Sequence, residues 1–290
     1  MHFVEVKGIL SAQNGMNIYR GCTHGCIYCD SRSKCYKMDH AFEDVEVKSN
    51  APELLEKRLR SKRQNCMIGT GAMSDPYMHC EEQLGLTRKC LEIIDSHQFG
   101  LTILTKSDRI MRDMDLLTSI NNKSKCVVQM TLTTYNDELC KVIEPNVCVT
   151  SERAKVLMEC KERGIPTVVW LCPILPFIND TEENIKGILD ICIKAEVKGI
   201  ICWNMGVTLR EGDREYFYDA LDKHFPGLKE KYIRTYGNMY DVESPRSYEL
   251  MKMFRKICKE HGIMCDVDEC FNYLNEYPEK YRQLSIFDLM

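Results

Sequence analysis

Three cysteines lie within eight positions of one short segment, RGCTHGCIYCD at residues 20–30. Three residues separate Cys22 from Cys26, and two separate Cys26 from Cys29. Thiolates bind soft metals and iron–sulfur clusters, and the glycines of this segment allow a loop to fold tightly around such a group. Three thiolates would leave one iron of a [4Fe-4S] cluster with an open coordination position, which serves catalysis. The spacing therefore predicts a cluster with a reactive iron.

A zinc site and chance clustering are the alternatives for this cysteine triplet. A structural zinc ion could be held by the triplet with His24 or a distant cysteine as a further ligand, and three cysteines could also fall close together by chance. The surrounding pattern favours the cluster, because a candidate first strand at residues 16–19 precedes the triplet and a series of strands and helices follows it.

The rest of the chain alternates short apolar runs with longer amphipathic ones, and this pattern is typical of βα units. Runs that are apolar at nearly every position indicate parallel strands covered on both faces. In β/α barrels the chemistry lies at the carboxyl ends of the strands, and these runs all end in polar or glycine-containing segments. The predicted strands are 66–71, 101–106, 126–134, 167–175 and 199–206.

Composition places few limits on function. The chain has 290 residues, of which 44% are hydrophobic and 28% charged, and its net charge of −4 gives no sign of a nucleic-acid binder. The sequence shows no signal peptide and no apolar stretch near the roughly 18 residues of a membrane helix, so we expect a cytoplasmic protein. Most of the 17 cysteines are scattered singly through apolar segments, which indicates a reducing compartment.

The triplet matches the CxxxCxxC hallmark of the radical SAM superfamily, and the segment NIYRGCTHGCIYCDSR resembles the spore photoproduct lyase-like branch of that family. The resemblance covers roughly residues 14–205 and includes several spaced motifs in order. These are GTGAMSDPY (69–77) followed by Glu81 or Glu82, LTKSDRIMRDMDLL (104–117), TLTT (131–134), IEP (143–145), GIP (164–166) and PILPFIND (173–180).

The resemblance implies an α/β fold, namely a partial (β/α)6 TIM-type barrel of the radical SAM type with a C-terminal extension. We expect the barrel in residues 1–240 and a helical extension and tail in residues 241–290. It also implies two cofactors, a [4Fe-4S] cluster held by Cys22, Cys26 and Cys29, and S-adenosylmethionine. Reductive cleavage of this cofactor would give a 5′-deoxyadenosyl radical that abstracts hydrogen from a substrate, with a flavodoxin- or ferredoxin-type protein as reductant.

Three further residues are implied to bind S-adenosylmethionine. Tyr28 occupies the family position that packs against adenine, although a core tyrosine would look the same in sequence. Ser74 and Asp75 end the second strand, where the family binds the methionine moiety; turn formation before Pro76 is the alternative role for both.

Three more candidates end the next strands. Lys106 resembles the lysine that pairs with the methionine carboxylate, although a lysine at a strand end could simply be solvated. Thr131 and Thr133 could donate hydrogen bonds to the ribose or carboxylate, but β-branched residues are also common in strands.

The chain departs from spore photoproduct lyases at the groups that relay hydrogen. Those enzymes carry a hydrogen-donating cysteine at the position of Ala72 and a tyrosine at the position of Asp30, and neither residue here can replace its counterpart. We therefore expect no ordinary photoproduct repair. Cys66 and Cys80 lie nearby in the sequence, but the sequence alone does not assign either as the donor.

The C-terminal part carries two further patterns. The spacings of Cys258, Cys265 and Cys270 do not match compact cluster motifs, so we do not predict an auxiliary cluster. Near the end, QLSIF resembles the pentapeptide that binds bacterial sliding clamps, although the tail could instead pack on its own barrel. The residues of this motif are Gln283, Leu284, Ser285, Ile286 and Phe287.

The substrate is not encoded in any local motif. Nucleic acid is the first hypothesis, because of the likeness to a DNA repair enzyme and the clamp-like tail, and both are analogies. The alternatives are radical modification of a peptide or small molecule, and a non-catalytic iron–sulfur protein for electron transfer. Polar strand ends argue against the last, since an electron carrier needs no cofactor pocket.

Overall fold

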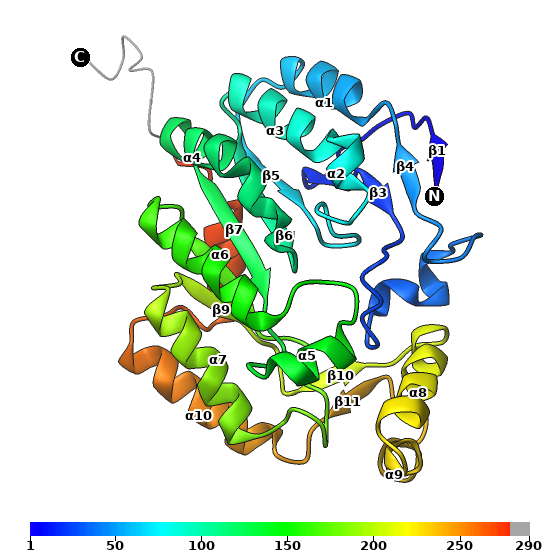
Figure 1. Ribbon diagram of the computed structural model, residues 1–290. Helices are drawn as coiled ribbons and strands as arrows, with labels where there is room; N and C mark the ends of the chain where they lie inside the picture. Colours follow the sequence, from blue (N-terminus) through cyan, green and yellow to red (C-terminus); the bar gives the residue numbers. More distant parts are fainter. Residues whose placement is uncertain (279–290) are drawn as a thin grey trace.

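A six-stranded parallel sheet forms the centre of the computed structural model, which describes residues 1–278 (Figure 1). The strands follow one another across the sheet in the order β2-β5-β6-β7-β8-β9, and every pair of neighbours is parallel. Their bounds are β2 Gly15–Met16, β5 Met67–Thr70, β6 Gly100–Thr105, β7 Cys126–Thr131, β8 Thr167–Trp170 and β9 Gly199–Ile201. Each of the five apolar runs therefore contains a parallel strand, as predicted, but the runs at 126–134, 167–175 and 199–206 extend beyond the ends of β7, β8 and β9 into the loops that follow.

Helices connect these strands and cover the outside of the sheet (Figure 1). They are α2 Glu81–Leu84, α3 Leu86–Ser96, α4 Met114–Lys123, α5 Asp137–Ile143, α6 Thr150–Glu162 and α7 Glu182–Lys194; a 3₁₀ turn, η3 Asp108–Asp113, precedes α4. The edge strands β2 and β9 do not pair with each other in the described part of the chain, so the barrel is partial. This confirms the predicted α/β class.

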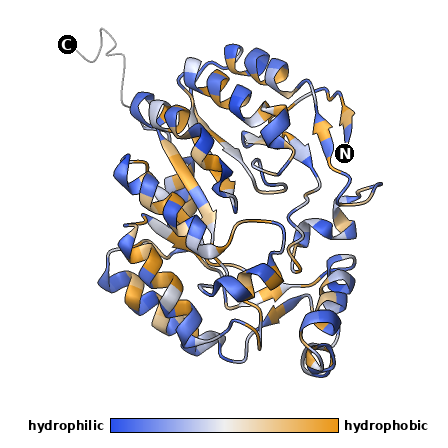
Figure 2. Cartoon of the chain, in the orientation of Figure 1, coloured by the Kyte–Doolittle hydropathy of each residue, from blue (hydrophilic) through white to orange (hydrophobic). Residues whose placement is uncertain are grey.

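The hydropathy of each element explains its place in the fold (Figure 2). All six residues of β7 are buried, as expected for a central strand covered on both faces. Helix α10, Ser247–Glu260, instead buries Leu250, Met251, Phe254 and Cys258, which lie on one face at helical spacing. Burial of such faces against the sheet is what closes the hydrophobic core.

A small N-terminal sheet supports the segment that carries the cysteine triplet. Its strands are β1 His2–Val4, β3 Tyr19–Arg20 and β4 Glu46–Lys48, in the order β1-β4-β3. Two short 3₁₀ turns, η1 Asp30–Arg32 and η2 Lys34–Tyr36, follow the triplet, and α1 Ala51–Arg60 leads into β5.

After β9 the chain builds a two-stranded antiparallel sheet and four helices. Strand β10, Gly206–Thr208, pairs antiparallel with β11, Asp241–Glu243, across the boundary predicted at residue 240. Helices α8 Asp213–His224 and α9 Leu228–Tyr236 lie between these two strands. Helix α10 packs beside α7 (Figure 1), and α11, Val267–Asn275, packs beside β9.

Three predictions concern membrane spans, the C-terminal motif and the C-terminal cysteines. None of the helices within residues 1–278 is long and apolar enough to cross a membrane. The QLSIF motif at residues 283–287 lies outside the described residues, so clamp binding stays a prediction. Cys258 and Cys270 are buried among apolar residues, as small core side chains would be.

Candidate functional site

The three cysteines of the triplet line one cavity of about 570 Å³ at the carboxyl ends of the strands. Gly21 has a φ of +88°, and a Cβ atom there would lie 2.4 Å from the carbonyl oxygen of Phe42. That same oxygen accepts a 3.1 Å hydrogen bond from the backbone N–H of Cys22. Only glycine permits this close approach, so the triplet begins on a backbone held against the loop that precedes β4.

Burial determines the protonation of the three thiols of the triplet. Burial raises the pKa of the Cys22 thiol to about 12, while the backbone N–H groups of His24 and Asp75 lower it. Burial likewise raises the pKa of Cys26 and Cys29. Without a cation the buried thiols stay protonated, and bound iron would stabilise their thiolates.

The separation of the three sulfur atoms bears on the zinc alternative. A tetrahedral zinc ion with ligands about 2.3 Å away requires sulfur atoms roughly 3.8 Å apart. Within residues 1–278, the group of His, Cys, Asp and Glu side chains whose ligand atoms all lie within 4.8 Å of one another does not include the triplet or His24. The wider spacing is suited to thiolates that each bind a different iron.

Asp75 connects the ends of two neighbouring strands at the base of the cavity. Its carboxylate accepts a hydrogen bond of 2.7 Å from the Thr105 hydroxyl and another of 2.7 Å from the backbone N–H of Lys106. It also accepts a hydrogen bond of 2.8 Å from the backbone N–H of Tyr77, so Asp75 stabilises the local turn around Pro76 as well. With both strand ends held by one buried carboxylate, the position of Lys106 relative to the triplet is well defined.

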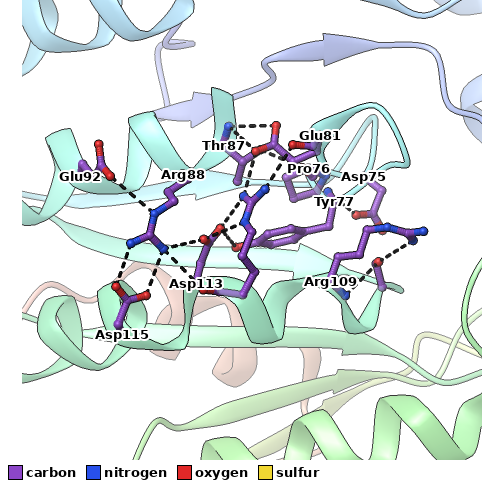
Figure 3. Close-up of polar contacts among 12 residues, drawn as sticks. Asp75, Pro76, Tyr77, Glu81, Thr87, Arg88, Glu92, Arg109, Asp113 and Asp115 are labelled. Carbon is purple, nitrogen blue, oxygen red and sulfur yellow. Dashed lines mark hydrogen bonds and ion pairs between the residues drawn. The ribbon is translucent and has the colours of Figure 1, made fainter. Parts of the chain in front are cut away.

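A network of ion pairs around two buried carboxylates supports the loop that carries Asp75 (Figure 3). The Tyr77 hydroxyl donates to Asp113 at 3.1 Å, and Asp113 forms ion pairs with Arg88 at 2.9 Å and Arg112 at 2.8 Å. Arg112 also pairs with the buried Glu81 at 2.9 Å. Because these partners come from α2, α3 and η3, three connecting elements fix one turn of the site.

Lys106 directly follows β6 and lines the cavity, and its ammonium group makes no hydrogen bond or ion pair within the described chain. Its Nζ atom lies 5.9 Å from the centre of the Tyr28 ring. Burial lowers the pKa of Lys106, but the neighbouring Cys26 side chain and Glu144 carboxylate raise it more, so its pKa is above its ordinary value. The lysine is therefore a cation without a close anionic partner, as expected for a group that receives a ligand carboxylate.

Tyr28 lines the cavity with its ring and is held by its hydroxyl. The hydroxyl donates to Glu144, which forms a fully buried ion pair with Arg153 at 2.5 Å. Arg153 donates in turn to the carbonyl oxygens of Thr131 and Cys148. Tyr28 is thus a cavity wall and a core tyrosine at once, because its ring faces the cavity while its hydroxyl is anchored in the core.

The structure brings eight of the nine predicted site residues to this one cavity, and Thr133 is the exception. The eight are Cys22, Cys26, Tyr28, Cys29, Ser74, Asp75, Lys106 and Thr131. Thr133 instead donates to the buried Glu144 at 3.4 Å and does not line the cavity. The Ser74 hydroxyl donates to the carbonyl oxygen of Tyr19 at 2.7 Å, which fixes the β5 end beside β3.

Sequence reasoning missed the residues at the other side of the cavity. We call Trp203, Asn204, Tyr240 and Asp241 the exposed rim, because Trp203 is 51% and Tyr240 48% exposed while both line the cavity. The Trp203 ring lies 5.5 Å from the ring of Trp170, and Asn204 donates to Asp241 at 3.4 Å. Two of these four residues, Trp203 and Asn204, lie in the polar segment CWNMG that ends the fifth apolar run, and this position at a strand end could have indicated them.

Asp30, which stands where photoproduct lyases have a tyrosine, holds other groups in the cavity wall. Its carboxylate accepts a hydrogen bond of 2.7 Å from the hydroxyl of Tyr36 and forms an ion pair with Arg210 Nε at 3.2 Å. Tyr36 lines the cavity, so a phenol is present near this position after all. Ala72 also lines the cavity, as does the thiol of Cys172, whereas Cys66 and Cys80 do not.

Comparisons with known proteins agree with this geometry. Residues 16–192 match the model of the radical SAM superfamily, so the chain belongs to that family. Its cofactors are accordingly a [4Fe-4S] cluster and S-adenosylmethionine. The fold is similar to that of spore photoproduct lyase with bound AdoMet and dinucleoside spore photoproduct, with a TM-score of 0.61, 14% identity, and 87% and 75% of the two chains covered.

The curated relatives are themselves uncharacterized. A protein of Methanocaldococcus jannaschii is 34% identical over 177 residues, which are 60% of this chain and 65% of that protein. One of Mycobacterium tuberculosis is 27% identical over 229 residues, which are 76% of this chain and 66% of that protein. The chain thus spans just under two thirds of the length of these relatives.

Proposed function

We propose that the chain is a radical SAM enzyme that cleaves S-adenosylmethionine reductively and abstracts hydrogen from a substrate, with Cys22, Cys26 and Cys29 as the cluster ligands. When bound, the two cofactors supply a 5′-deoxyadenosyl radical. The observation that carries the proposal is the meeting of eight predicted residues, from three strand ends and one loop, in a single cavity.

The residues of the chain have separate tasks in this proposal. Lys106 binds the carboxylate of S-adenosylmethionine, and the Tyr28 ring packs against its adenine. Asp75 positions Lys106 through its backbone, and Ser74 and Thr131 complete the wall around the methionine and ribose. Such a fixed arrangement excludes water from a reactive centre and orients the substrate.

Anaerobic reconstitution with iron and sulfide tests this function. The reduced protein should form 5′-deoxyadenosine, and Cys26→Ala should form none. Cys66→Ala is the matched control, because this thiol lies outside the cavity. Equal product from both variants would contradict the proposal, and cluster binding without any product would favour the electron-transfer alternative.

Nucleic acid is the substrate class we propose first. The exposed rim supports it, because aromatic rings at a cavity mouth stack on bases whatever their sequence. Peptides and small molecules are the alternative. Comparing 5′-deoxyadenosine formation with single-stranded DNA and with peptide mixtures separates the two, since only a bound substrate accelerates productive cleavage.

Repair of spore photoproduct by the relay of the known lyases is not part of this proposal. Ala72 has no thiol and Asp30 no phenol, so both relay groups are missing at their usual positions. A dinucleotide photoproduct assay should show no efficient conversion to thymidines. Efficient conversion would direct attention to Cys172, a further thiol that lines the cavity.

Two partners belong to the same proposal, within a cytoplasmic setting. A flavodoxin- or ferredoxin-type protein supplies the electron. A bacterial sliding clamp binds Gln283, Leu284, Ser285, Ile286 and Phe287, with an affinity of micromolar order, about −8 kcal/mol, because a short peptide loses conformational freedom on binding.

Fluorescence anisotropy of a labelled 276–290 peptide with purified clamp tests the second partner. The Gln283→Ala, Phe287→Ala double variant is the control, since Phe287 is the largest apolar anchor. Equal binding of both peptides, or none by either, would remove the clamp from the proposal.

A further inference from the structure

A second group of metal-ligating side chains lies away from the cavity, where β1 meets the loop that precedes β4. His2 belongs to β1, and His40 and Asp44 belong to the loop. One ligand atom of each residue lies within 4.8 Å of the others. The His2 Nδ1 atom is 3.0 Å from Asp44 Oδ2, and the two imidazole rings meet edge to face at 4.8 Å.

The hydrogen bond of His40 determines which of its nitrogens is free. Nδ1 lies 3.0 Å from the carbonyl oxygen of Ala41, and a carbonyl only accepts, so Nδ1 is the donor. In the neutral ring this leaves a lone pair on Nε2. That Nε2 atom is buried and has no hydrogen-bond partner in the described chain. Metal-binding histidines are oriented in this way, by donation of the other ring N–H to a carbonyl.

A carboxylate stands on the far side of the same nitrogen. Glu46 Oε2 lies 3.9 Å from His40 Nε2, and the two side chains are only 16% and 15% exposed. Glu46 is also the register partner of His2 in the parallel pairing of β1 with β4. A second carboxylate therefore stands beside the group of three, next to His40.

We propose that His2, His40, Asp44 and Glu46 bind a zinc ion. Imidazole and carboxylate ligands suit this metal, and a tetrahedral site with ligands about 2.0 Å from zinc needs ligand atoms roughly 3.3 Å apart. The His2–Asp44 separation of 3.0 Å and the His40–Glu46 separation of 3.9 Å are close to this value. Glu46 lies outside the group of three within 4.8 Å, so its side chain would have to move toward His2 and Asp44 on zinc binding. Surface polar contacts alone would account for Asp44, which bonds His2 and also pairs through Oδ1 with the Met1 ammonium at 2.9 Å. They leave the buried His40 Nε2 atom without a hydrogen bond in the described chain.

The site has a consequence for the cysteine triplet. His40 and Asp44 flank Phe42, whose carbonyl oxygen accepts the backbone N–H of Cys22 at 3.1 Å. A zinc ion that links both flanking residues to β1 and β4 would restrain this carbonyl. The ion, bound outside the cavity, would thereby order the backbone that carries Cys22, the first cluster ligand.

Zinc counting on the cluster-loaded protein tests the proposal, because iron then occupies the triplet. After equilibrium dialysis against micromolar zinc, mass spectrometry should find about one zinc per chain beyond the iron. His40→Gln and Asp44→Asn should each weaken zinc binding at least about tenfold, the loss that removal of even an outer partner of a metal ligand causes. His97→Gln is the matched control, because His97 pairs with one carboxylate, Glu56, at 3.0 Å without a second imidazole.

Hydrogen–deuterium exchange gives a second readout that does not depend on activity. Zinc should slow exchange in peptides covering residues 37–46 of the wild type and of His97→Gln, and should leave His40→Gln unchanged. Unaltered iron content in each variant shows that the fold is intact. Zinc bound equally by the wild type and His40→Gln, or a content well below one per chain, would overturn the proposal.

Discussion

The two sides of the cavity differ in how firmly their side chains are held. Around Cys22, Asp75 and Lys106 the wall is buried, and one carboxylate accepts three hydrogen bonds from neighbouring elements. The exposed rim has a tryptophan that is 51% exposed and a 3.4 Å contact between Asn204 and Asp241. A cofactor that is always the same needs a rigid wall, whereas exposed side chains at a rim can reorient to fit a substrate.

Loss of a cluster ligand should have the largest effect on the buried wall. Cys22→Ala, Cys26→Ala and Cys29→Ala should each abolish the [4Fe-4S] cluster, because no residue with suitable spacing replaces the missing thiolate. Iron and sulfide analysis with electron paramagnetic resonance of the reduced protein measures this. Iron near four per chain in the triple variant would show that other ligands hold the cluster.

Glu144→Gln should cause the next largest effect, on stability. The substitution leaves the fully buried Arg153 without its ion pair, and such a loss costs about 3–5 kcal/mol. Denaturant unfolding of the two proteins gives the difference. Arg163→Gln, which breaks an exposed pair with Glu159, is the control and should cost at most about 1 kcal/mol.

The same pair predicts a pH dependence. Burial by itself would raise the pKa of Glu144, but Arg153 and Lys106 lower it more, so its pKa in the folded protein is below the ordinary value. Its contribution to stability is then complete above the unfolded pKa of about 4.3 and is lost as the pH falls through the lower folded value. The wild type should lose stability more steeply than Glu144→Gln in this acid range, and parallel acid limbs would contradict the assignment.

Lys106→Ala should weaken S-adenosylmethionine binding while the cluster stays in place. Removal of a charge-assisted hydrogen bond costs about 1.5–3 kcal/mol, which is about tenfold or more in affinity. Calorimetry on the cluster-loaded protein measures it, with Lys123→Ala as the control because Lys123 pairs with Asp95 outside the cavity. Unchanged affinity would mean that the cofactor carboxylate binds elsewhere.

Trp203→Ala should have the smallest effect, confined to the exposed rim. We expect a loss of about 1 kcal/mol in binding of single-stranded DNA, the lower end of the range for a base stacked on an aromatic ring. Cofactor binding should not change. Tyr248→Ala, an 84% exposed aromatic that does not line the cavity, is the control, and equal losses from both substitutions would argue against stacking at the rim.

The buried wall could be predicted largely from sequence because its signals are local. Cys22, Cys26 and Cys29 fall in one segment, and Asp75 and Lys106 end apolar runs of recognisable periodicity. Thr133 shows the limit of this reasoning. It follows the same strand as Thr131, but its hydroxyl bonds Glu144 and does not line the cavity, and nothing in the strand pattern distinguishes the two threonines.

The sequence by itself determined the cluster ligands and the order of the βα units, since thiolate spacing and hydrophobic periodicity are properties of short segments. Only the tertiary structure decided what holds Tyr28, whose partner Glu144 is 116 residues away, and what forms the exposed rim, which the pairing of β10 with β11 completes. Such contacts depend on how distant elements pack, and each alone is too weak and too remote in sequence to leave a local pattern.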